Sequence, residues 1–433
     1  MTTDSRHLNT TSERIEARYW IETAYALADA AAMMAGEQST GTFVKVPGET
    51  EELRERYAAR VERIDELGTV DAPSLSGSGL PKGHTGPVVR RTAEVTLSWP
   101  IENMGPSLPN LLATVAGNLY ELKPFSGLKL IDVKLPPAFL QAYQGPQFGV
   151  EGTRTLTGVH GRPLIGTIIK PSVGMTPAQT AAQVRMLAEA GIDFIKDDEL
   201  QADGPHCPFE ERVPAVLREL NAFADKTGKR VMYAANITGE IDQMLRRHDL
   251  VASLGGTCVM ASLNSIGLPA MVVLRRHSLL AIHGHRNGWG MYSRSHATGM
   301  SFIAFQKFWR LAGIDHVHVN GLSNKFCEAD ESVVASAREC LTPMFPAPHA
   351  PCTILPVFSS GQSARQAPDT YKALGSNDLL YACGGGILAH PQGPAAGVRS
   401  LHQAWEAAAA GIPLSEYARK QTELHAALEK FAS

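Results

Sequence analysis

The sequence lacks the features that mark secreted and disulfide-rich proteins. It has only six cysteines in 433 residues, and no two of them form a CxxC pair; they stand at positions 207, 258, 327, 340, 352 and 383. Neither a disulfide framework nor a zinc site is therefore expected, and a reducing cytoplasm is the expected location. Residues 1–20 are polar and lack the apolar segment of a secretory signal, which agrees with a cytoplasmic protein.

Long hydrophobic runs and an excess of one charge are also absent. Residues 24–36 form the richest apolar stretch near the N-terminus, but Asp29 interrupts it and it is too short to span a bilayer. Forty Lys and Arg nearly balance 43 Asp and Glu, whereas nucleic-acid-binding proteins usually carry a basic patch. We therefore expect neither a membrane nor a nucleic acid as a partner. With 44% hydrophobic residues, 19% charged residues and 39 glycines, the composition is typical of a compact α/β enzyme.

The first of two predicted blocks, residues 1–140, is expected to be an α+β ferredoxin-like domain. Strands are predicted over 18–23, 42–46, 88–99 and 129–135, with helices over 25–34 and from 109 to 115. The resulting order β-α-β-β-α-β is that of a ferredoxin-like sandwich. Charges at helical spacing over 51–67 add a further helix, and the Gly-, Pro- and Ser-rich residues 71–87 predict a surface loop.

The second block, residues 141–433, repeats a strand–turn–helix unit about eight times. Strands are predicted over 164–170, 192–198, 231–237, 257–263, 279–285, 316–320, 353–358 and 379–383. The first helix is well marked, because Thr176 can cap it, Pro177 suits its first position and Gly191 follows its end. Such repeats with apolar strands predict a closed (β/α)8 TIM barrel. An open doubly wound sheet is the competing fold, but it usually has a GxGxxG motif after its first strand, which is absent here.

The C-terminal ends of the predicted barrel strands carry many polar residues and glycines. In a (β/α)8 barrel these ends form the active site. A barrel with only a structural role would not need the following residues to converge there: Lys170, Lys196, Asp197, Asp198, Glu199, Asn236, Thr238, His283, His285, Arg286, His316, His318, Lys325, Ser359, Ser360, Gly361, Gly384, Gly385 and Gly386. We therefore expect an active site at this mouth of the barrel.

Asp198 and Glu199 suggest a magnesium site, because Mg²⁺ prefers oxygen ligands. Lysine cannot bind a metal as its ammonium, but CO2 added to the Lys196 amine would give an anionic carbamate oxygen. A charged turn in which Lys196 pairs with an acid explains this short run equally well.

Three glycines after the last strand and several basic side chains suggest a phosphate site. The amides of Gly384 and Gly385 can approach an anion closely, and Arg286 can clamp a phosphate or carboxylate. A flexible turn is the alternative explanation for the glycines. Among the histidines, we expect His283 and His316 to be packed core, and we favour functional roles for His285 and His318.

Taken together, several segments resemble the large-subunit motifs of RuBisCO. In the barrel these are GRPLIGTIIKPSVGMT, GIDFIKDDEL, HGHR, DHVHVNGLSNK and GGGILAHP, and in the first domain they are EQSTGTF and AGNLYELK. The resemblance extends over residues 17–420, and the joint set is highly specific although each motif alone is not.

The resemblance implies a homodimer in which first-domain residues of one subunit complete the barrel site of the other. It implies that carbamylated Lys196, Asp198 and Glu199 bind Mg²⁺. It implies that Lys170 moves protons and that Lys325, on a mobile loop, stabilises a substrate carboxylate. The remaining positions that it implies for a phosphorylated sugar-acid substrate are Glu37, Thr42, Asn118, His285, Arg286, His318, Ser359, Gly361, Gly384 and Gly385.

The chain also departs from the RuBisCO pattern at several of these motifs. Ser172 replaces the second lysine of KPKxG, Ile168 replaces a threonine, Phe43 replaces a tryptophan, and Ser360 replaces the middle glycine of SGG. The loop VNGLSN before Lys325 lacks the usual glycine and threonine positions. These changes argue against carboxylation of ribulose bisphosphate, and the chain is identified as a member of the RuBisCO-like, form IV branch.

Members of that branch form an enediolate from a phosphorylated sugar derivative and differ in the next step. Retention of Lys325 favours a substrate with a carboxylate beside the reacting carbon. The expected function is therefore Mg-dependent decarboxylation of 3-oxo-isoapionate 4-phosphate, a carboxy-lyase reaction. The alternatives are transcarboxylase/hydrolase cleavage of the same compound to phosphoglycerate and glycolate, and an enolase or isomerase reaction of a methylthio-sugar phosphate. A non-catalytic sensor is disfavoured because the proposed metal ligands are all present.

Overall fold

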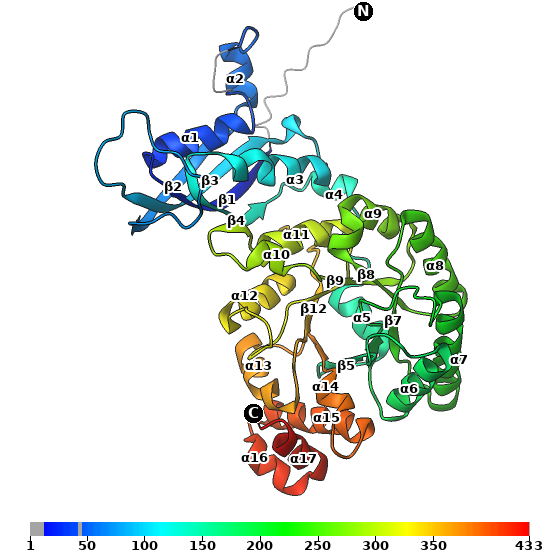
Figure 1. Cartoon of the computed structure of the whole chain (residues 1–433). Helices are drawn as coiled ribbons and strands as arrows, with labels where there is room; N and C mark the ends of the chain where they lie inside the picture. Colours follow the sequence, from blue (N-terminus) through cyan, green and yellow to red (C-terminus); the bar gives the residue numbers. More distant parts are fainter. Residues whose placement is uncertain (1–12, 42–45, 433) are drawn as a thin grey trace, which may run out of the picture. The chain divides into compact units, whose positions relative to one another are not determined.

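A computed structural model describes residues 13–41 and 46–432. By internal contacts the chain forms two compact units, which are described separately (Figure 1). The smaller unit comprises the described residues up to Ala142 together with Met291–Phe305, and the larger unit comprises Tyr143–Gly290 and the described residues from Gln306 onward. The domain boundary that we place between residues 140 and 141 stays a prediction.

The smaller unit is built on a five-stranded sheet in the order β10-β4-β1-β3-β2. The four main strands are antiparallel, and β10 adds to β4 in parallel. This order of the four main strands fits the predicted ferredoxin-like arrangement. The elements are β1 (Arg14–Thr23), α1 (Leu27–Glu37), α2 (Glu51–Tyr57), β2 (Arg60–Val70), β3 (Arg90–Pro100), α3 (Leu108–Ala116), β4 (Phe125–Lys134), α4 (Phe139–Ala142) and β10 (Thr298–Met300), with short 3₁₀ turns at Ile101–Asn103 and Asn118–Glu121.

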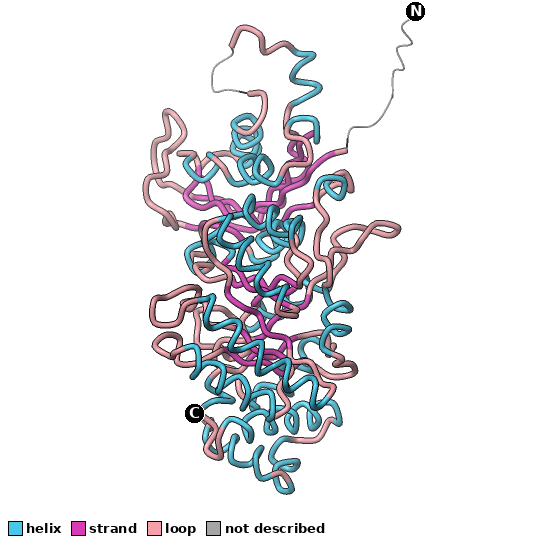
Figure 2. The backbone as a smooth tube through the Cα atoms, turned by 90° about the vertical axis from the view of Figure 1, so that its right-hand side faces the viewer, coloured by secondary structure: helices cyan, strands magenta, loops and turns pink. Residues whose placement is uncertain are grey.

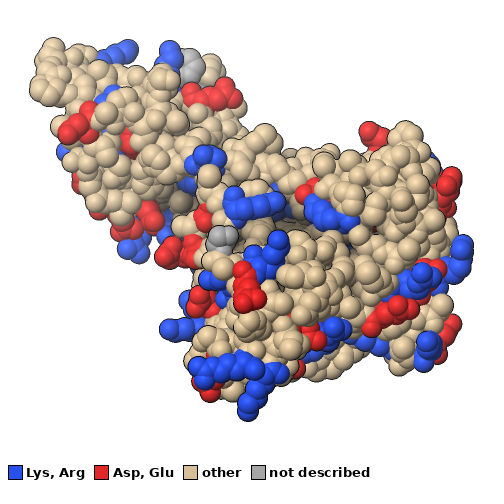
Figure 3. Space-filling view, turned by 60° about the horizontal axis from the view of Figure 1, so that its bottom comes forward, with Lys and Arg blue, Asp and Glu red and all other residues tan. Residues whose placement is uncertain are grey.

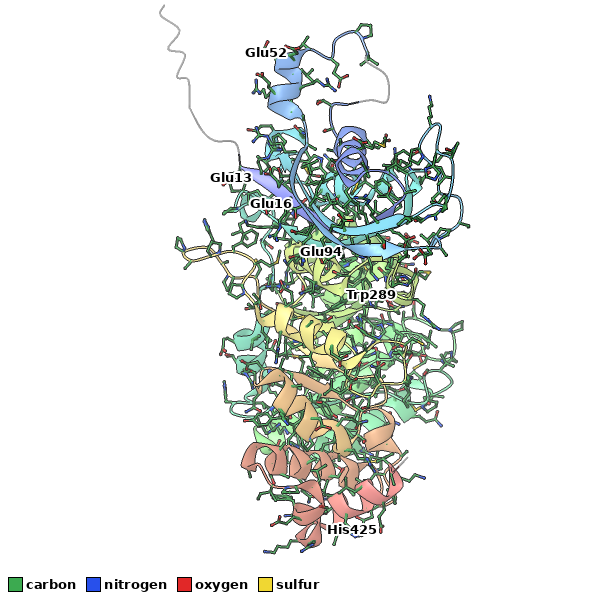
Figure 4. The ribbon with its side chains drawn as sticks, turned by 90° about the vertical axis from the view of Figure 1, so that its left-hand side faces the viewer. Glu13, Glu16, Glu52, Glu94, Trp289 and His425 are labelled. Atoms are coloured by element: carbon green, nitrogen blue, oxygen red, sulfur yellow. The ribbon has the colours of Figure 1, made fainter. Side chains whose placement is uncertain are left out.

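Alternation of side chains gives this sheet one buried face and one charged face. Along β1, Ile15, Ala17, Tyr19 and Ile21 are buried, whereas the residues between them are partly exposed. On the other face, charged side chains pair across strands, as Arg18 Nη1 does with Glu94 Oε2 at 2.7 Å. Glu94 and Glu16 are labelled on this sheet in Figure 4.

The helix predicted over residues 51–67 is wrong for most of its length. A short helix, capped by Thr50, ends at Tyr57, and Arg60–Val70 is the edge strand β2. Its pairing with β3 outweighs the helical spacing of its charges, which lie largely exposed on the sheet edge. The second strand of the sheet is therefore β2; of the strand predicted over 42–46, residues 42–45 lie outside the described residues.

The larger unit contains a closed barrel of eight parallel strands, which confirms the predicted architecture. Figure 2 shows the strands surrounded by helices. The strands are β5 (Leu164–Ile168), β6 (Phe194–Lys196), β7 (Met232–Asn236), β8 (Cys258–Ser262), β9 (Ala281–His285), β11 (His316–His318), β12 (Leu355–Phe358) and β13 (Leu380–Ala382). Each lies within a predicted range, and β13 closes the barrel by pairing with β5.

Helices connect these strands, as the sequence predicts. The first, α6 (Pro177–Glu189), has Thr176 as its N-cap in a reciprocal capping box with Gln179. The others are α5 (Gly149–Thr157), α7 (Phe209–Thr227), α8 (Ile241–Ser253), α9 (Leu263–His277), α11 (Phe302–Ala312), α12 (Asp330–Leu341), α13 (Ala367–Leu374), α14 (Gly385–Leu388), α15 (Pro394–Ala410), α16 (Leu414–Tyr417) and α17 (Thr422–Lys430), with 3₁₀ turns at Ala364–Gln366 and Ala418–Lys420. The short helix α10 (Gly290–Ser293) falls mostly within the Met291–Phe305 segment of the smaller unit.

The barrel core is apolar below the strand ends. Leu164, Phe194, Met232, Met260 and Leu380 come from different strands and form one buried cluster. Among the described residues no helix combines the length and the apolar character needed to cross a membrane. On the face drawn in Figure 3, basic and acidic side chains are interspersed, in keeping with the small net charge of −3.

Candidate active site

The end of β6 brings together the three predicted metal ligands. Lys196 is 1% exposed, and its Nζ lies 3.2 Å from Glu199 Oε2 and donates to the Asp197 carbonyl at 2.8 Å. Burial lowers the pKa of the Lys196 amine despite the carboxylates around it. A lowered pKa favours the neutral amine, which is the form that can react with CO2.

Asp197, the next residue after Lys196, fixes the end of β6 through buried polar contacts. Its buried carboxylate pairs with Arg212 Nη2 at 3.1 Å and accepts hydrogen bonds from the Tyr233 hydroxyl at 2.5 Å and the Asn236 amide at 3.0 Å. The Asn236 side chain in turn donates to the carbonyl oxygens of Asp198 and Glu199 at 3.1 and 3.3 Å. The sequence predicts Asp197 and Asn236 only as residues at strand ends. A polar residue within or directly after an apolar strand indicates a buried polar contact. The sequence does not identify the partners, because they come from distant positions in the chain.

Lys170, at the end of β5, reaches the same cluster. Its Nζ lies 2.6 Å from Asp198 Oδ2 and donates to Ser172 Oγ at 2.8 Å. Ser172 stands where the RuBisCO pattern has a second lysine. Lys170 therefore has a neutral hydroxyl beside it instead of a second cation. Lys170 is exposed, whereas Asp198 is buried. The Lys170 ammonium therefore lies between the buried carboxylate and solvent.

His285, at the end of β9, adds a neutral imidazole next to an ionised carboxylate. Its Nε2 lies 3.4 Å from Glu199 Oε2. Burial lowers the pKa of His285 to about 4, and the nearby Lys196 acts in the same direction. Burial opposes ionisation of Glu199, but His285 and Lys196 outweigh it and bring its pKa to about 2.

The remaining three histidines of strands β9 and β11 are buried, and two of them contact each other. His318 Nε2 lies 2.9 Å from His283 Nε2, and His318 Nδ1 lies 2.8 Å from Ser359 Oγ. His316 instead contacts the Thr153 hydroxyl at 2.7 Å on the α5 side. Burial lowers the pKa of all three histidines, so they are neutral near pH 7. The structure thus places His318 beside Ser359, with His283 behind it.

Arg286 lies one residue beyond β9 and is 5% exposed. Its Nη2 pairs with Glu328 Oε2 at 2.9 Å. Its guanidinium carbon lies 5.9 Å from the ring centre of Trp289, which is labelled in Figure 4. The Arg286–Glu328 pair was not foreseen from the sequence, because Glu328 belongs to the loop beyond Lys325.

Lys325 and the strand-end glycines occupy neighbouring loops. Lys325 is exposed, and its amide donates to the Ser360 carbonyl at 3.3 Å. Gly361 adopts a φ of +88°, a conformation that favours glycine. Gly384 lies beside the side chain of Ile168, and Gly385 begins the short helix α14, whose first N–H groups point out of the helix.

Two of the three predicted first-domain residues meet within the smaller unit. Asn118 Nδ2 donates to Glu37 Oε1 at 3.5 Å. The third, Thr42, and the adjacent Phe43 lie outside the described residues.

Two polar sites elsewhere on the larger unit do not offer the same chemistry. His248, Asp249 and His277 cluster on helices α8 and α9, and both imidazoles are hydrogen-bonded to the Asp249 carboxylate. A cleft of about 560 Å³ opens beside Asp203 and Arg247, which form an ion pair at 2.6 Å. Neither site is at a strand end, and we favour the barrel mouth as the reactive site.

The closed barrel with lysines and carboxylates at its strand ends is typical of (β/α)8-barrel enzymes. Comparison with known proteins identifies the family. Residues 149–431 match the catalytic domain of the ribulose bisphosphate carboxylase large chain, and residues 7–139 match its N-terminal domain. The chain belongs to the RuBisCO large-chain family, as the sequence motifs predicted.

Within that family the chain is most usefully compared with RuBisCO-like enzymes. It is 56% identical to the 3-oxo-isoapionate-4-phosphate transcarboxylase/hydrolase of Xanthobacter autotrophicus, over 96% of this chain and 99% of the relative. It is 47% identical to the 3-oxo-isoapionate-4-phosphate decarboxylase of Rhizobium etli, over 96% and 98%. A solved RuBisCO-like protein from Burkholderia fungorum shares 48% identity with a TM-score of 0.88, covering 96% and 99%. The chain is therefore a RuBisCO-like protein and an enzyme.

Proposed function

We propose that this enzyme cleaves a carbon–carbon bond of 3-oxo-isoapionate 4-phosphate at the barrel mouth. The proposal rests on three basic side chains that meet two neighbouring carboxylates. Lys170 contacts Asp198, and both Lys196 and His285 contact Glu199. Relatives over nearly the full length that are named for this compound support the choice of substrate.

The donor set fits Mg²⁺ when CO2 is bound to Lys196. Asp198 and Glu199 alone supply only two protein carboxylates, and a carbamate on the adjacent Lys196 would supply a third anionic ligand. The buried amine with its lowered pKa suits that modification. When bound by these three residues, Mg²⁺ would draw electron density from the substrate ketone and stabilise negative charge on the neighbouring carbon.

We propose separate roles for the remaining residues at the mouth of the barrel. In decarboxylation, the bond to the carboxylate breaks, CO2 leaves, and the electron pair remains on the carbon next to the ketone. Lys325 and His285 orient that carboxylate, and Lys170 then gives a proton to the carbon. The phosphate is bound by these residues: Arg286, His318, Ser359, Gly361, Gly384 and Gly385.

The transcarboxylase/hydrolase reaction is the second candidate, and the 56% identity to the Xanthobacter enzyme of that name supports it. In that reaction the carboxylate first moves to the former ketone carbon, and the carbon that it leaves becomes the new ketone. Water then adds to the new ketone, and the bond between these two carbons breaks to give phosphoglycerate and glycolate. The same residues serve both routes, because both place negative charge next to the ketone and both need the carboxylate and the phosphate held.

We also propose a homodimer in which the two subunits share each active site. Glu37, Thr42 and Asn118 would then act on the barrel of the partner subunit. The Asn118–Glu37 hydrogen bond supports a joint role for these two side chains.

Product analysis tests the proposed reaction directly. The enzyme is incubated with 3-oxo-isoapionate 4-phosphate, Mg²⁺ and bicarbonate, and the carbon and phosphorus spectra are followed by NMR. CO2 with a tetrulose phosphate would establish decarboxylation, whereas phosphoglycerate with glycolate would establish the hydrolytic route. An unchanged spectrum would overturn the β-keto acid proposal and redirect the assay to methylthio-sugar phosphates.

A further inference from the structure

Ser360 and Asn320 occupy positions that set this chain apart from the RuBisCO pattern. Ser360 replaces the middle glycine of SGG, and Asn320 is the second residue of the altered loop VNGLSN that leads to Lys325. Both retain the backbone conformation that favours glycine, with φ of +69° and +67°. A residue other than glycine is costly in this region, although asparagine tolerates it better than most. Both side chains should therefore contribute contacts that offset the cost.

Those contacts form a continuous chain of hydrogen bonds. The Ser360 hydroxyl donates to Asn320 Oδ1 at 2.8 Å. On the other side of the same amide, Asn320 Nδ2 donates to Glu328 Oε2 at 2.5 Å. Glu328 Oε2 also pairs with Arg286 Nη2 at 2.9 Å. The chain of contacts Ser360–Asn320–Glu328–Arg286 thus connects the ends of β12, β11 and β9.

This chain of contacts also fixes the loop that carries Lys325. Glu328 closes the loop at its far end, where its Oε1 accepts a hydrogen bond from Ser332 at 2.9 Å. The Ser360 carbonyl accepts from the Lys325 amide at 3.3 Å. The loop is therefore held at both ends by residues of one network, and that network ends on the buried Arg286 guanidinium.

We propose that Ser360, Asn320 and Glu328 are positioning residues that set the orientation of Arg286 for a phosphate dianion and couple it to the Lys325 loop. This inference rests on the proposed function only in the choice of phosphate as the anion. Ser360 acts without touching substrate: its hydroxyl fixes which way the Asn320 amide faces, so that the NH2 group is directed at Glu328. Arg286 then meets the phosphate in one preset geometry.

Substitution of Ser360 by glycine gives a clean test, because the backbone there already suits glycine. Ser360→Gly removes one hydroxyl and leaves the charges of the site unchanged. Ser323→Gly is the matched control, since Ser323 is an exposed serine of the Lys325 loop whose φ of +47° also suits glycine. The Ser323 backbone amide donates a hydrogen bond to Asp330 Oδ1 at 2.8 Å, and glycine preserves this contact.

The binding of inorganic phosphate, measured by calorimetry on the full chain, reports on Arg286 independently of turnover. We expect Ser360→Gly to weaken phosphate binding about two- to tenfold, the effect of one lost hydrogen bond. Ser323→Gly should leave it unchanged. In a Glu328→Gln background, Ser360→Gly should have less than about a twofold further effect, because the link to Arg286 has already been altered.

The outcomes separate this inference from the proposed reaction. Equal effects of Ser360→Gly in the wild-type and Glu328→Gln backgrounds would overturn it, since a purely structural serine acts independently of Glu328. No change in phosphate binding with Ser360→Gly would also overturn it. If the enzyme leaves 3-oxo-isoapionate 4-phosphate unchanged while phosphate binding shows the expected coupling, the reaction proposal fails and the positioning network stands.

Discussion

At the scale of single residues, the chemistry depends on which charges are buried together. Lys196 has almost no exposure, and its amine lies beside the Glu199 carboxylate, whereas Lys170 and Lys325 are exposed. The same residue type therefore has three environments around one site. This difference in environment supports the proposed modification of Lys196 by CO2 and the proposed contact of the two exposed lysines with the substrate.

Lys325→Ala tests whether the loop lysine holds the substrate carboxylate. We expect kcat/KM for carbon–carbon cleavage to fall about ten- to a hundredfold, as for the loss of a hydrogen bond to a charged group. Steady-state kinetics measure the change. Exchange of the substrate's carbon-bound protons with deuterated water, followed by NMR, is the control and should persist. If cleavage and exchange fall equally, Lys325 does not act on the carboxylate.

At this scale the sequence reveals residue types better than their partners. Lys196, Asp198 and Glu199 were predicted together because they are adjacent in the chain and follow one strand. The support from Arg212, Tyr233 and Asn236 could not be predicted, because it depends on how three separate elements meet around Asp197. The pairing of Arg286 with Glu328 was missed for the same reason.

At the scale of elements, β6 is short and depends on buried polar contacts at both of its ends. Before the strand, Asp193 is fully buried, pairs with Arg162 at 2.5 Å and Lys229 at 2.9 Å, and accepts from the Ile165 amide at 2.9 Å. After it, Asp197 is held by Arg212. These two carboxylates fix the strand that presents Lys196 to the mouth of the barrel.

Asp193→Asn should destabilise the barrel, by about 2 kcal/mol, because it leaves partly buried cations without their counter-charge. Thermal or urea unfolding measures the loss. Asp242→Asn is the control, since the ion pair of Asp242 with Arg246 is exposed, and it should cause a much smaller loss. Equal stability of the Asp193 variant and the wild-type protein would contradict this role.

The same carboxylate predicts a pH dependence of stability. Burial raises the pKa of Asp193, but Arg162 and Lys229 outweigh burial and hold it below the usual value. Its contribution is therefore complete above the unfolded-state pKa of about 3.9 and is lost as the pH falls through the lower folded-state value. Unfolding measured from pH 6 downward should show a smaller acid loss in Asp193→Asn than in the wild-type protein.

Elements were predicted well where they are buried and poorly where they are exposed. All eight barrel strands fall within their predicted ranges, because apolar runs between turns are a strong signal. The exposed edge strand β2 was taken for helix, since its charges carry little information about pairing. The three-residue strand β10, which pairs with β4 at the edge of the sheet, was not predicted.

At the scale of the whole molecule, the proposed dimer with shared sites can be tested by mixing two inactive variants. Glu37→Gln impairs the first-domain contribution and Lys196→Ala impairs the barrel. If each site combines two subunits, refolded mixtures should recover up to about a quarter of wild-type activity, because each heterodimer contains one intact site. Turnover after joint refolding measures this recovery, with each variant refolded alone as the control. An absence of recovery in proven heterodimers would show that each site lies within one subunit.

If Lys196 binds CO2 as a carbamate and thereby completes a magnesium site, carbon NMR of the whole enzyme in ¹³C-bicarbonate with Mg²⁺ detects the modification directly. We expect a protein-bound carbamate signal in the wild-type enzyme. The signal should be retained in Lys170→Ala, which alters a neighbouring lysine at the same mouth, and lost in Lys196→Ala. If the wild-type enzyme gives no such signal, or if the signal persists in Lys196→Ala, Lys196 is not the residue that binds CO2.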